Sequence, residues 1–242
     1  MGKFFIAGLI NIETTVAING FPLEYIPAHF PFYGLFTAAS GVGLNIAKAL
    51  TSLGNQVDFA SLVSADDNGF LARKTLTDVG ISDDLVLNQL EATAQSVILY
   101  APDGRRQIHV DLKNIQNQEY PIKLVEKPIQ NCDLAVICNI NFARPFLELA
   151  RDAGKWIATD VHAISDLDDD YNRDYMGHAQ ILFVSDEKLP DSPECVSRDL
   201  MDRYKNEIIV IGVGGKGALM AIRKDDFIGR FAVFWTNVFF FF

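Results

Sequence analysis

The fold is decided by residues 40–62, which read SGVGLNIAKALTSLGNQVDFASL. Apolar side chains recur there at intervals of four and three, and this spacing predicts an amphipathic helix over Gly43–Leu53. Gly54 stands where a helix commonly ends in a glycine. The apolar run Val57–Leu62 comes next and predicts a buried strand. A helix followed at once by a buried strand is typical of an α/β protein.

The same alternation continues over most of the chain. Short apolar runs predict five more strands, at Phe4–Leu9, Leu134–Cys138, Trp156–Asp160, Ile181–Val184 and Ile208–Ile211. Two more helices are predicted, at Asp67–Val79 and Ala143–Ala153. The runs are continuously apolar, as parallel strands are when both faces of a sheet are covered. The sequence therefore predicts an α/β fold with a doubly wound, mostly parallel sheet flanked by helices.

Two segments, at about residues 12–37 and 96–110, interrupt this pattern. The first contains three prolines and has no helical period. The second predicts a hairpin that turns at Pro102-Asp103-Gly104. Both predict β structure outside the main sheet, and we expect them to form a small β-lid inserted into one domain, residues 1–242.

Composition limits the classes of partner. The chain has 242 residues, a net charge of −10 and 49% hydrophobic residues, enough for one sizeable core. A strongly acidic protein is a poor binder of nucleic acid or of anionic membranes, so neither is expected as a partner. The first apolar run is too short for a signal peptide or a membrane span, and three unpaired cysteines suit a reducing compartment. A cytoplasmic location is therefore expected, and no residue spacing predicts a protein-held metal.

Polar residues follow the first predicted strand and open the first predicted helix. Asn11 and Glu13 are two residues apart, so on an extended chain they share one face, where an amide and a carboxylate suit the neighbouring hydroxyls of a sugar. Gly41, Gly43 and Asn45 precede or begin the helix, and free backbone N–H groups at a helix start also suit hydroxyls. In an open α/β sheet these positions face the ligand crevice.

A second glycine-rich turn, Gly212-Val-Gly-Gly-Lys-Gly217, follows the strand Ile208–Ile211. Its spacing matches a dinucleotide fingerprint, but Ala218–Ile222 predicts a strand where that fingerprint and a Walker A loop need a helix. The turn instead fits a hairpin on which a nucleotide lies close to the backbone. A dinucleotide-dependent oxidoreductase stays as the weakest alternative. Asp160 and His162, at the end of another strand, either line the crevice or cap the next element.

Together these residues resemble the ribokinase family, the PfkB-type carbohydrate kinases. Gly8-Leu-Ile-Asn11-Ile-Glu13 is similar to the family's first sugar-binding motif, and Ser40-Gly-Val-Gly-Leu-Asn45 is similar to its GGxGxN signature. Residues 45–81 follow the family pattern most closely. Residues 179–189, AQILFVSDEKL, resemble the strand leading to its Asn-x-x-Glu motif, with Ser185 and Lys188 at those two positions.

The resemblance implies ATP-dependent phosphorylation of a sugar or nucleoside hydroxyl, with Mg²⁺ as the metal cofactor. It implies the substrate-binding residues Asn11, Glu13, Gly41, Gly43 and Asn45. It implies the nucleotide-binding residues Ser185, Gly212, Gly214 and Gly217. The lids of this family often pair between subunits, so a homodimer through the β-lid is also implied.

The resemblance covers residues 3 to about 224. Complete family members next carry Asn-Thr-x-Gly-Ala-Gly-Asp, whose Asp is the catalytic base, whereas residues 231–242 here read FAVFWTNVFFFF. We therefore expect a domain that is incomplete at its C-terminus, with no catalytic residue to assign. The apolar ending is expected either as a buried last strand or as a chain that stops early. The alternative function is a non-catalytic relic or regulator that binds a sugar or nucleoside.

Overall fold

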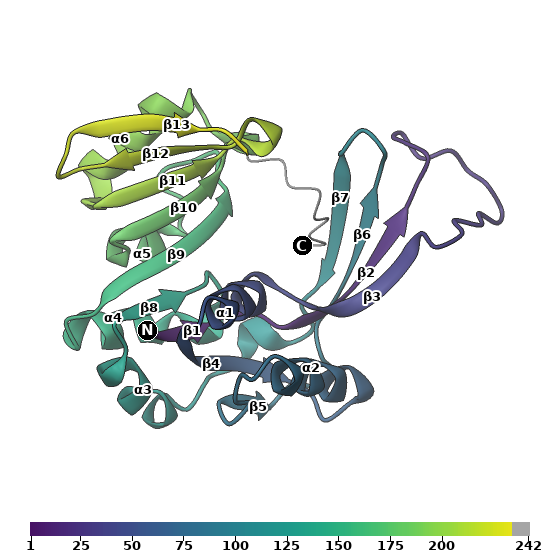
Figure 1. Ribbon diagram of the computed structural model, residues 1–242, viewed down its shortest axis with the longest axis horizontal. Coiled ribbons are helices and arrows are strands. Elements are labelled where there is room, and N and C mark those ends of the chain that lie inside the picture. The colour runs from purple at the N-terminus through teal and green to yellow at the C-terminus, as the bar shows by residue number, and fades with distance from the viewer. Residues whose placement is uncertain (234–242) are drawn as a thin grey trace.

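A nine-stranded sheet runs through the computed structural model, which describes residues 1–233 (Figure 1). The strand order is β13-β12-β11-β10-β9-β8-β1-β4-β5. Neighbouring strands from β11 to β5 pair in parallel, and only β12 and β13 join the edge antiparallel. The strands are β1 (Lys3–Ala7), β4 (Gln56–Val63), β5 (Val86–Asn88), β8 (Leu134–Ile137), β9 (Trp156–Ala163), β10 (Ile181–Ser185), β11 (Ile208–Gly212), β12 (Ala218–Ile222) and β13 (Phe227–Phe231).

Helices cover both faces of this sheet. One face packs against α1 (Val42–Ser52) and α2 (Asp67–Asp78). The other packs against α3 (Glu126–Asn131), α4 (Pro145–Asp152), α5 (Arg173–His178) and α6 (Pro193–Tyr204). The side chains of β1 alternate between the two apolar cores, with Phe5 in one and Ile6 in the other. The predicted doubly wound α/β fold is confirmed.

Three predicted boundaries were wrong. The strand expected to end at Asp160 continues as β9 to Ala163. The first strand was expected to reach Leu9, but β1 ends at Ala7 because Gly8 crosses α1, where a Cβ on Gly8 would lie 2.9 Å from the Cα of Gly43. The third helix was expected from Ala143, but a 3-10 turn occupies Asn141–Ala143 and α4 begins at Pro145. Proline favours the first helical position because its missing N–H would have no partner there.

A second, four-stranded sheet projects from the main body (Figure 1). Its order is β3-β2-β6-β7, with β2 and β6 parallel and the outer pairs antiparallel. Its strands are β2 (Asn11–Ala17), β3 (Leu35–Ser40), β6 (Gln95–Tyr100) and β7 (Arg106–Asp111). The β structure that was predicted outside the main sheet is therefore present, and residues 18–34 connect β2 to β3.

The helices are all short. The longest, α2 and α6, have 12 residues each, whereas about 20 are needed to cross a bilayer. Within residues 1–233, no helix is long and apolar enough to span a membrane. Of the apolar ending, residues 234–242 lie outside the described residues, so the expectation for them stays a prediction.

Candidate active site

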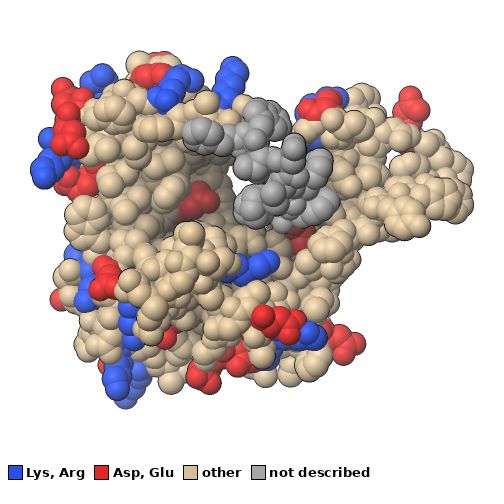
Figure 2. Space-filling model, in the orientation of Figure 1, with Lys and Arg blue, Asp and Glu red and all other residues tan. Residues whose placement is uncertain are grey.

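The predicted site residues gather along one edge of the large sheet. Strands β1, β4 and β8–β11 run parallel, so their carboxyl ends meet there, and only three residues separate the end of β1 from the start of β2. Ligands of open α/β sheets bind outside the carboxyl ends of the strands. Figure 2 shows the surface hollowed on this side, between the part that carries β9–β13 and the projecting small sheet.

Asn11 and Glu13 were predicted at the end of the first strand. They lie instead in β2 of the small sheet. They still share one face, together with Ser40, which is the register partner of Asn11, and Ser96, the partner of Glu13. The Nδ2 of Asn11 donates to Ser96 Oγ at 2.6 Å, and the Nδ2 of Asn45 donates to Ser40 Oγ at 3.5 Å. Both serines also lie close enough to the Glu13 carboxyl group to lower its pKa. Two hydroxyls thus join the three predicted side chains into one polar cluster.

One acceptor in this cluster has no donor. The Oδ1 of Asn11 is buried and makes no hydrogen bond to the described residues, and the whole side chain is only 4% exposed. Buried polar atoms in proteins are nearly always paired, so an unpaired one calls for a specific reason. The hydroxyl group of a ligand, or a water molecule, would donate the hydrogen bond that this oxygen lacks.

The carboxyl group of Glu13 is partly withdrawn from water. Burial raises its pKa, and hydrogen bonds from Ser40 and Ser96, together with the charge of Arg106, offset only part of the increase. A poorly hydrated carboxylate has acceptor sites that water does not fill. Glu13 is therefore suited to accept hydrogen bonds from the hydroxyls of a ligand.

Gly41 and Gly43 have a structural reason to be glycine. A Cβ on Gly41 would lie 2.4 Å from the carbonyl oxygen of Leu9, and the φ of 117° there disfavours any other residue. A Cβ on Gly43 would lie 2.8 Å from the Cα of Gly8, which is also too close. What approaches these glycines is the protein's own backbone, and this close crossing brings Asn11 next to α1. As predicted, no side chain caps the first N–H groups of α1.

The predicted nucleotide-binding residues lie at the ends of β10 and β11. Ser185 and Gly212 are register partners, so they are neighbours at the same edge. Nothing lies within 4 Å of a Cβ placed on Gly214, so its backbone faces open space. Gly217 differs, because a Cβ there would lie 1.9 Å from the carbonyl oxygen of Phe231. Close packing against β13 therefore explains Gly217 without a ligand.

The two groups of residues are separated by β8 and β9. Three strand spacings between β1 and β10 amount to roughly 14 Å. Asn139 follows the end of β8, and Asp160 lies within β9, three residues before its last residue. The backbone N–H of His162 donates to Asp160 Oδ1 at 2.7 Å. Sequence reasoning missed Asn139, although it is the first polar residue after an apolar run, the same signal that identified Asn11.

A carboxylate-bearing turn follows Ser185 directly. Asp186 and Glu187 lie in a 3-10 helix at the end of β10, and the backbone N–H of Glu187 donates to Ser185 Oγ at 3.4 Å. No cluster of three potential metal ligands occurs in residues 1–233. Magnesium that arrives with a nucleotide needs only one or two carboxylates besides phosphates and water, so this turn fits that mode of binding.

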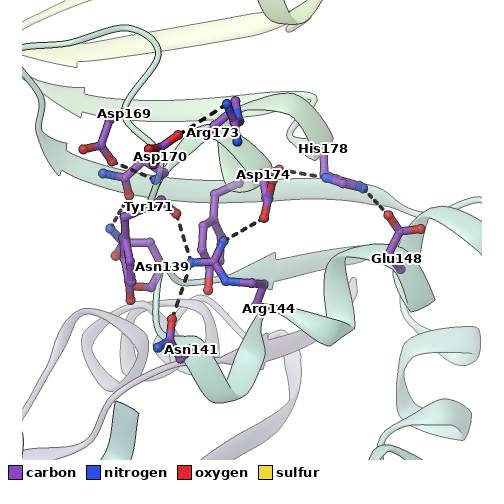
Figure 3. A network of polar contacts seen from close by, with 12 residues as sticks. Asn139, Asn141, Arg144, Glu148, Asp169, Asp170, Tyr171, Arg173, Asp174 and His178 are labelled. Carbon is purple, nitrogen blue, oxygen red and sulfur yellow. Dashed lines mark hydrogen bonds and ion pairs between the residues drawn. The ribbon is translucent and has the colours of Figure 1, made fainter. Parts of the chain in front are cut away.

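The loop beyond β9 is held by Arg144 (Figure 3). The guanidinium donates to Asp174 at 3.0 Å and to the carbonyl oxygen of Tyr171 at 2.9 Å. It also lies over the rings of Tyr171 and Tyr175, 5.0 and 4.7 Å from their centroids. Tyr171 in turn donates to the carbonyl oxygen of Asn139 at 3.1 Å. This network ties the start of α4 and the loop before α5 to the segment that follows β8.

The fold and the edge cluster define a class of protein. The sequence profile of the pfkB family of carbohydrate kinases matches residues 36–234. The chain therefore belongs to the pfkB carbohydrate kinase family, and the resemblance read from the sequence is confirmed. The dinucleotide alternative is wrong for the second glycine turn, since that turn leads into strand β12.

Several individual proteins are similar to this chain. An ATP-dependent ribose-1-phosphate kinase of Halopiger xanaduensis is 24% identical over 229 residues, which cover 90% of this chain and 73% of that protein. A microbiome-derived acarbose kinase has a TM-score of 0.84 at 22% identity and covers 98% of this chain and 78% of its own. The ribokinase of Arabidopsis thaliana, solved with ribose and ATP, has a TM-score of 0.72 at 17% identity, with 98% and 80% covered. At these identities the solved structures share the fold.

Proposed function

We propose that this chain binds a sugar or a nucleoside in the polar cluster and catalyses its ATP-dependent phosphorylation. The observation that carries the proposal is the unpaired, buried Oδ1 of Asn11 within the polar cluster. The substrate-binding residues we propose are Asn11, Glu13, Gly41, Gly43 and Asn45. The nucleotide-binding residues we propose are Ser185, Gly212, Gly214 and Gly217.

The chemistry rests mainly on positioning. Glu13 and the two asparagine amides orient the sugar hydroxyls, and the backbone at Gly212 and Gly214 receives the nucleotide on the other side of the gap. In phosphoryl transfer, positioning and charge neutralisation supply most of the rate acceleration. Gly217 contributes by fixing the turn, given its contact with Phe231.

The proposal includes Mg²⁺ bound with the nucleotide. Asp186 and Glu187 would hold it, and the metal would neutralise charge on the phosphates. Lys188 occupies the position of the family's carboxylate and adds a cation at the same edge. No general base is assigned to a residue of this chain.

We further propose that the segments at about 12–37 and 96–110 serve as a lid over the sugar. Strands β2 and β6 from these segments already supply Asn11, Glu13 and Ser96 to the cluster. A lid that excludes water strengthens every electrostatic contact within the site.

Isothermal titration calorimetry and a phosphoryl-transfer assay test the function. We expect a folded sample to bind ribose, inosine or another member of a sugar panel, and to bind MgATP. Asn45→Ala should weaken sugar binding by about tenfold, the effect of losing one or two hydrogen bonds. Asn131→Ala, at the exposed end of α3, is the matched control. Heat from no sugar and no nucleotide would contradict the proposal.

A second candidate function is suggested by Lys188, which stands where family members carry the carboxylate on the magnesium side. In that case the protein binds a sugar or nucleoside without phosphorylating it. Binding in the titration with no turnover of any bound sugar would favour this alternative. Turnover with any sugar would exclude it.

A further inference from the structure

Arg106 lies on the same face of the small sheet as the sugar cluster. Register partners share a face, and Arg106 pairs with Tyr100, which pairs with Ala17 of β2. Ala17 is four residues beyond Glu13 on that strand, so its side chain points to the same side. The guanidinium therefore projects over the face that carries Glu13 and Ser96.

Along the strands, one row of side chains separates Arg106 from Glu13, and across the sheet β6 lies between their strands. That row contains Thr15, Ile98 and Ile108, again as register partners. Along a strand, side chains on one face recur about every 6.7 Å. A ligand held at Glu13 that extends past this row and diagonally across β6 would reach Arg106.

The Arg106 guanidinium interacts with the rest of the described chain only through its electric field. Its field reaches Glu13, where it lowers the pKa of the carboxyl group, but the guanidinium forms no hydrogen bond or ion pair with residues 1–233. The neighbouring Arg105 contrasts with it, since its Nε donates to Asp103 at 2.7 Å and its guanidinium lies over the ring of Phe21.

The charge of the whole molecule makes such a cation significant. With a net charge of −10 the protein repels anions in general. An anionic substrate therefore needs a local cation beside the site. The guanidinium is the side chain best matched to a phosphate or carboxylate, because it binds two oxygens at once.

We propose that Arg106 makes the site selective for a sugar that carries an anionic group, a phosphate or a carboxylate, which the guanidinium binds while Glu13, Asn11 and Asn45 hold the hydroxyls. The inference rests on the proposed function and names the substrate class of the same site. A competing role for Arg106 is to neutralise Glu13 alone. In that case its removal would affect charged and uncharged sugars alike.

The test compares ribose with ribose 1-phosphate by isothermal titration calorimetry, on the wild type, Arg106→Met and Arg105→Met. We expect the wild type to bind ribose 1-phosphate at least about tenfold more tightly than ribose, the lower range for a hydrogen bond to a charged group. Arg106→Met should bring this ratio close to one. Arg105→Met removes the same charge one residue away and should keep the ratio. Arg106→Lys should keep part of the preference that Arg106→Met loses, since lysine has the positive charge but lacks the planar guanidinium that binds two oxygens.

The outcomes separate the inference from the function. Equal affinity of the wild type for both sugars, or an unchanged ratio in Arg106→Met, would overturn the role of Arg106 and leave a kinase for neutral sugars. The same ratio lost in Arg105→Met would also overturn it, because a general charge effect would then explain the preference. Heat from neither sugar would overturn the proposed function, and this inference with it. Inorganic phosphate alone, titrated in parallel, shows how much of the affinity comes from the anion.

Discussion

At the scale of single residues, the glycines at the start of α1 and the polar cluster have separate roles. Gly41 and Gly43 let the chain cross α1 closely. Asn11, Glu13 and Asn45 then meet through Ser40 and Ser96. Sequence reasoning identified the glycines and the three polar residues but missed both serines. The serines carry no local signal, because they matter only through contacts with residues distant in the chain.

Gly41→Ala tests the close crossing. The added Cβ would clash with the carbonyl oxygen of Leu9, and the backbone conformation there is strained for any residue other than glycine. We expect a loss of about 2–3 kcal/mol in the free energy of unfolding. Gly54→Ala is the control, because Gly54 also has a positive φ but has no atom within 4 Å of the added Cβ. Its cost should be about 1 kcal/mol. Urea denaturation measures both, and equal costs would contradict the crossing as the cause.

Glu13→Gln tests how the burial of the Glu13 carboxyl group affects stability. The folded state raises the pKa of Glu13, so it binds this proton more tightly than the unfolded chain does. Stability of the wild type should therefore fall as pH rises from about 4.5 through the folded pKa. Glutamine removes this loss. We expect the melting temperature of the variant to exceed that of the wild type at pH 8 by about 1–3 °C, since the group is partly exposed. The difference should vanish near pH 4.

The exposed Glu24 provides the control for this comparison. Glu24→Gln should leave the melting temperature unchanged at both pH values. A Glu13→Gln variant that is less stable than the wild type at pH 8 would show that the hydrogen bonds from Ser40 and Ser96 outweigh burial.

At the scale of elements, most long segments were predicted well, but the twelve-residue helix α6 was missed and several junctions were misplaced. Strands β4 and β8–β11 and helices α1 and α2 lie within a few residues of their predicted bounds. The end of β1 was misplaced because a contact with α1, and not local composition, pulls the chain out of the sheet. The short helices α3 and α5 have six residues each, too few for a periodic signal.

Arg144→Lys tests how the loop between β9 and α5 is held. Lysine keeps the charge but loses the planar fork that contacts Asp174, Tyr171 and Tyr175 together (Figure 3). We expect opening of residues 164–172 to become easier by about 2 kcal/mol, and hydrogen exchange there to become correspondingly faster. Arg151→Lys on the exposed side of α4 should leave that exchange unchanged. Equal exchange in both variants would mean that the loop is held by other contacts.

At the scale of the whole molecule, the outer part of the small sheet is unusually apolar. Tyr25, Phe30 and Phe32 in the connection between β2 and β3 are 91%, 73% and 86% exposed. The projecting tip in Figure 2 carries few charged side chains on the visible face. Large exposed apolar patches mark sites of protein association. We propose that this surface pairs with a second copy of the chain, so that the β-lid forms the interface of a homodimer.

Light scattering on the intact protein tests the dimer. We expect a mass of twice the chain mass of 26.9 kDa at micromolar concentration. Phe32→Ser should shift the protein toward the monomer, because it removes a large apolar group from the interface. Leu53→Ser changes an equally exposed apolar residue on the far end of α1 and should not. A monomeric wild type, or the same shift in both variants, would contradict the proposal.

The sequence by itself determined the α/β architecture, the presence of β structure outside the main sheet and the family. These depend on periodicity and on short motifs, which are local properties that neighbouring residues impose on one another. Only the tertiary structure decided which polar groups meet. Asn11 and Ser96 are 85 residues apart in the chain and 2.6 Å apart in space. Arg106 faces the same cluster only because β7 pairs with β6 in one particular register, and a shift of one residue would turn it to the opposite face.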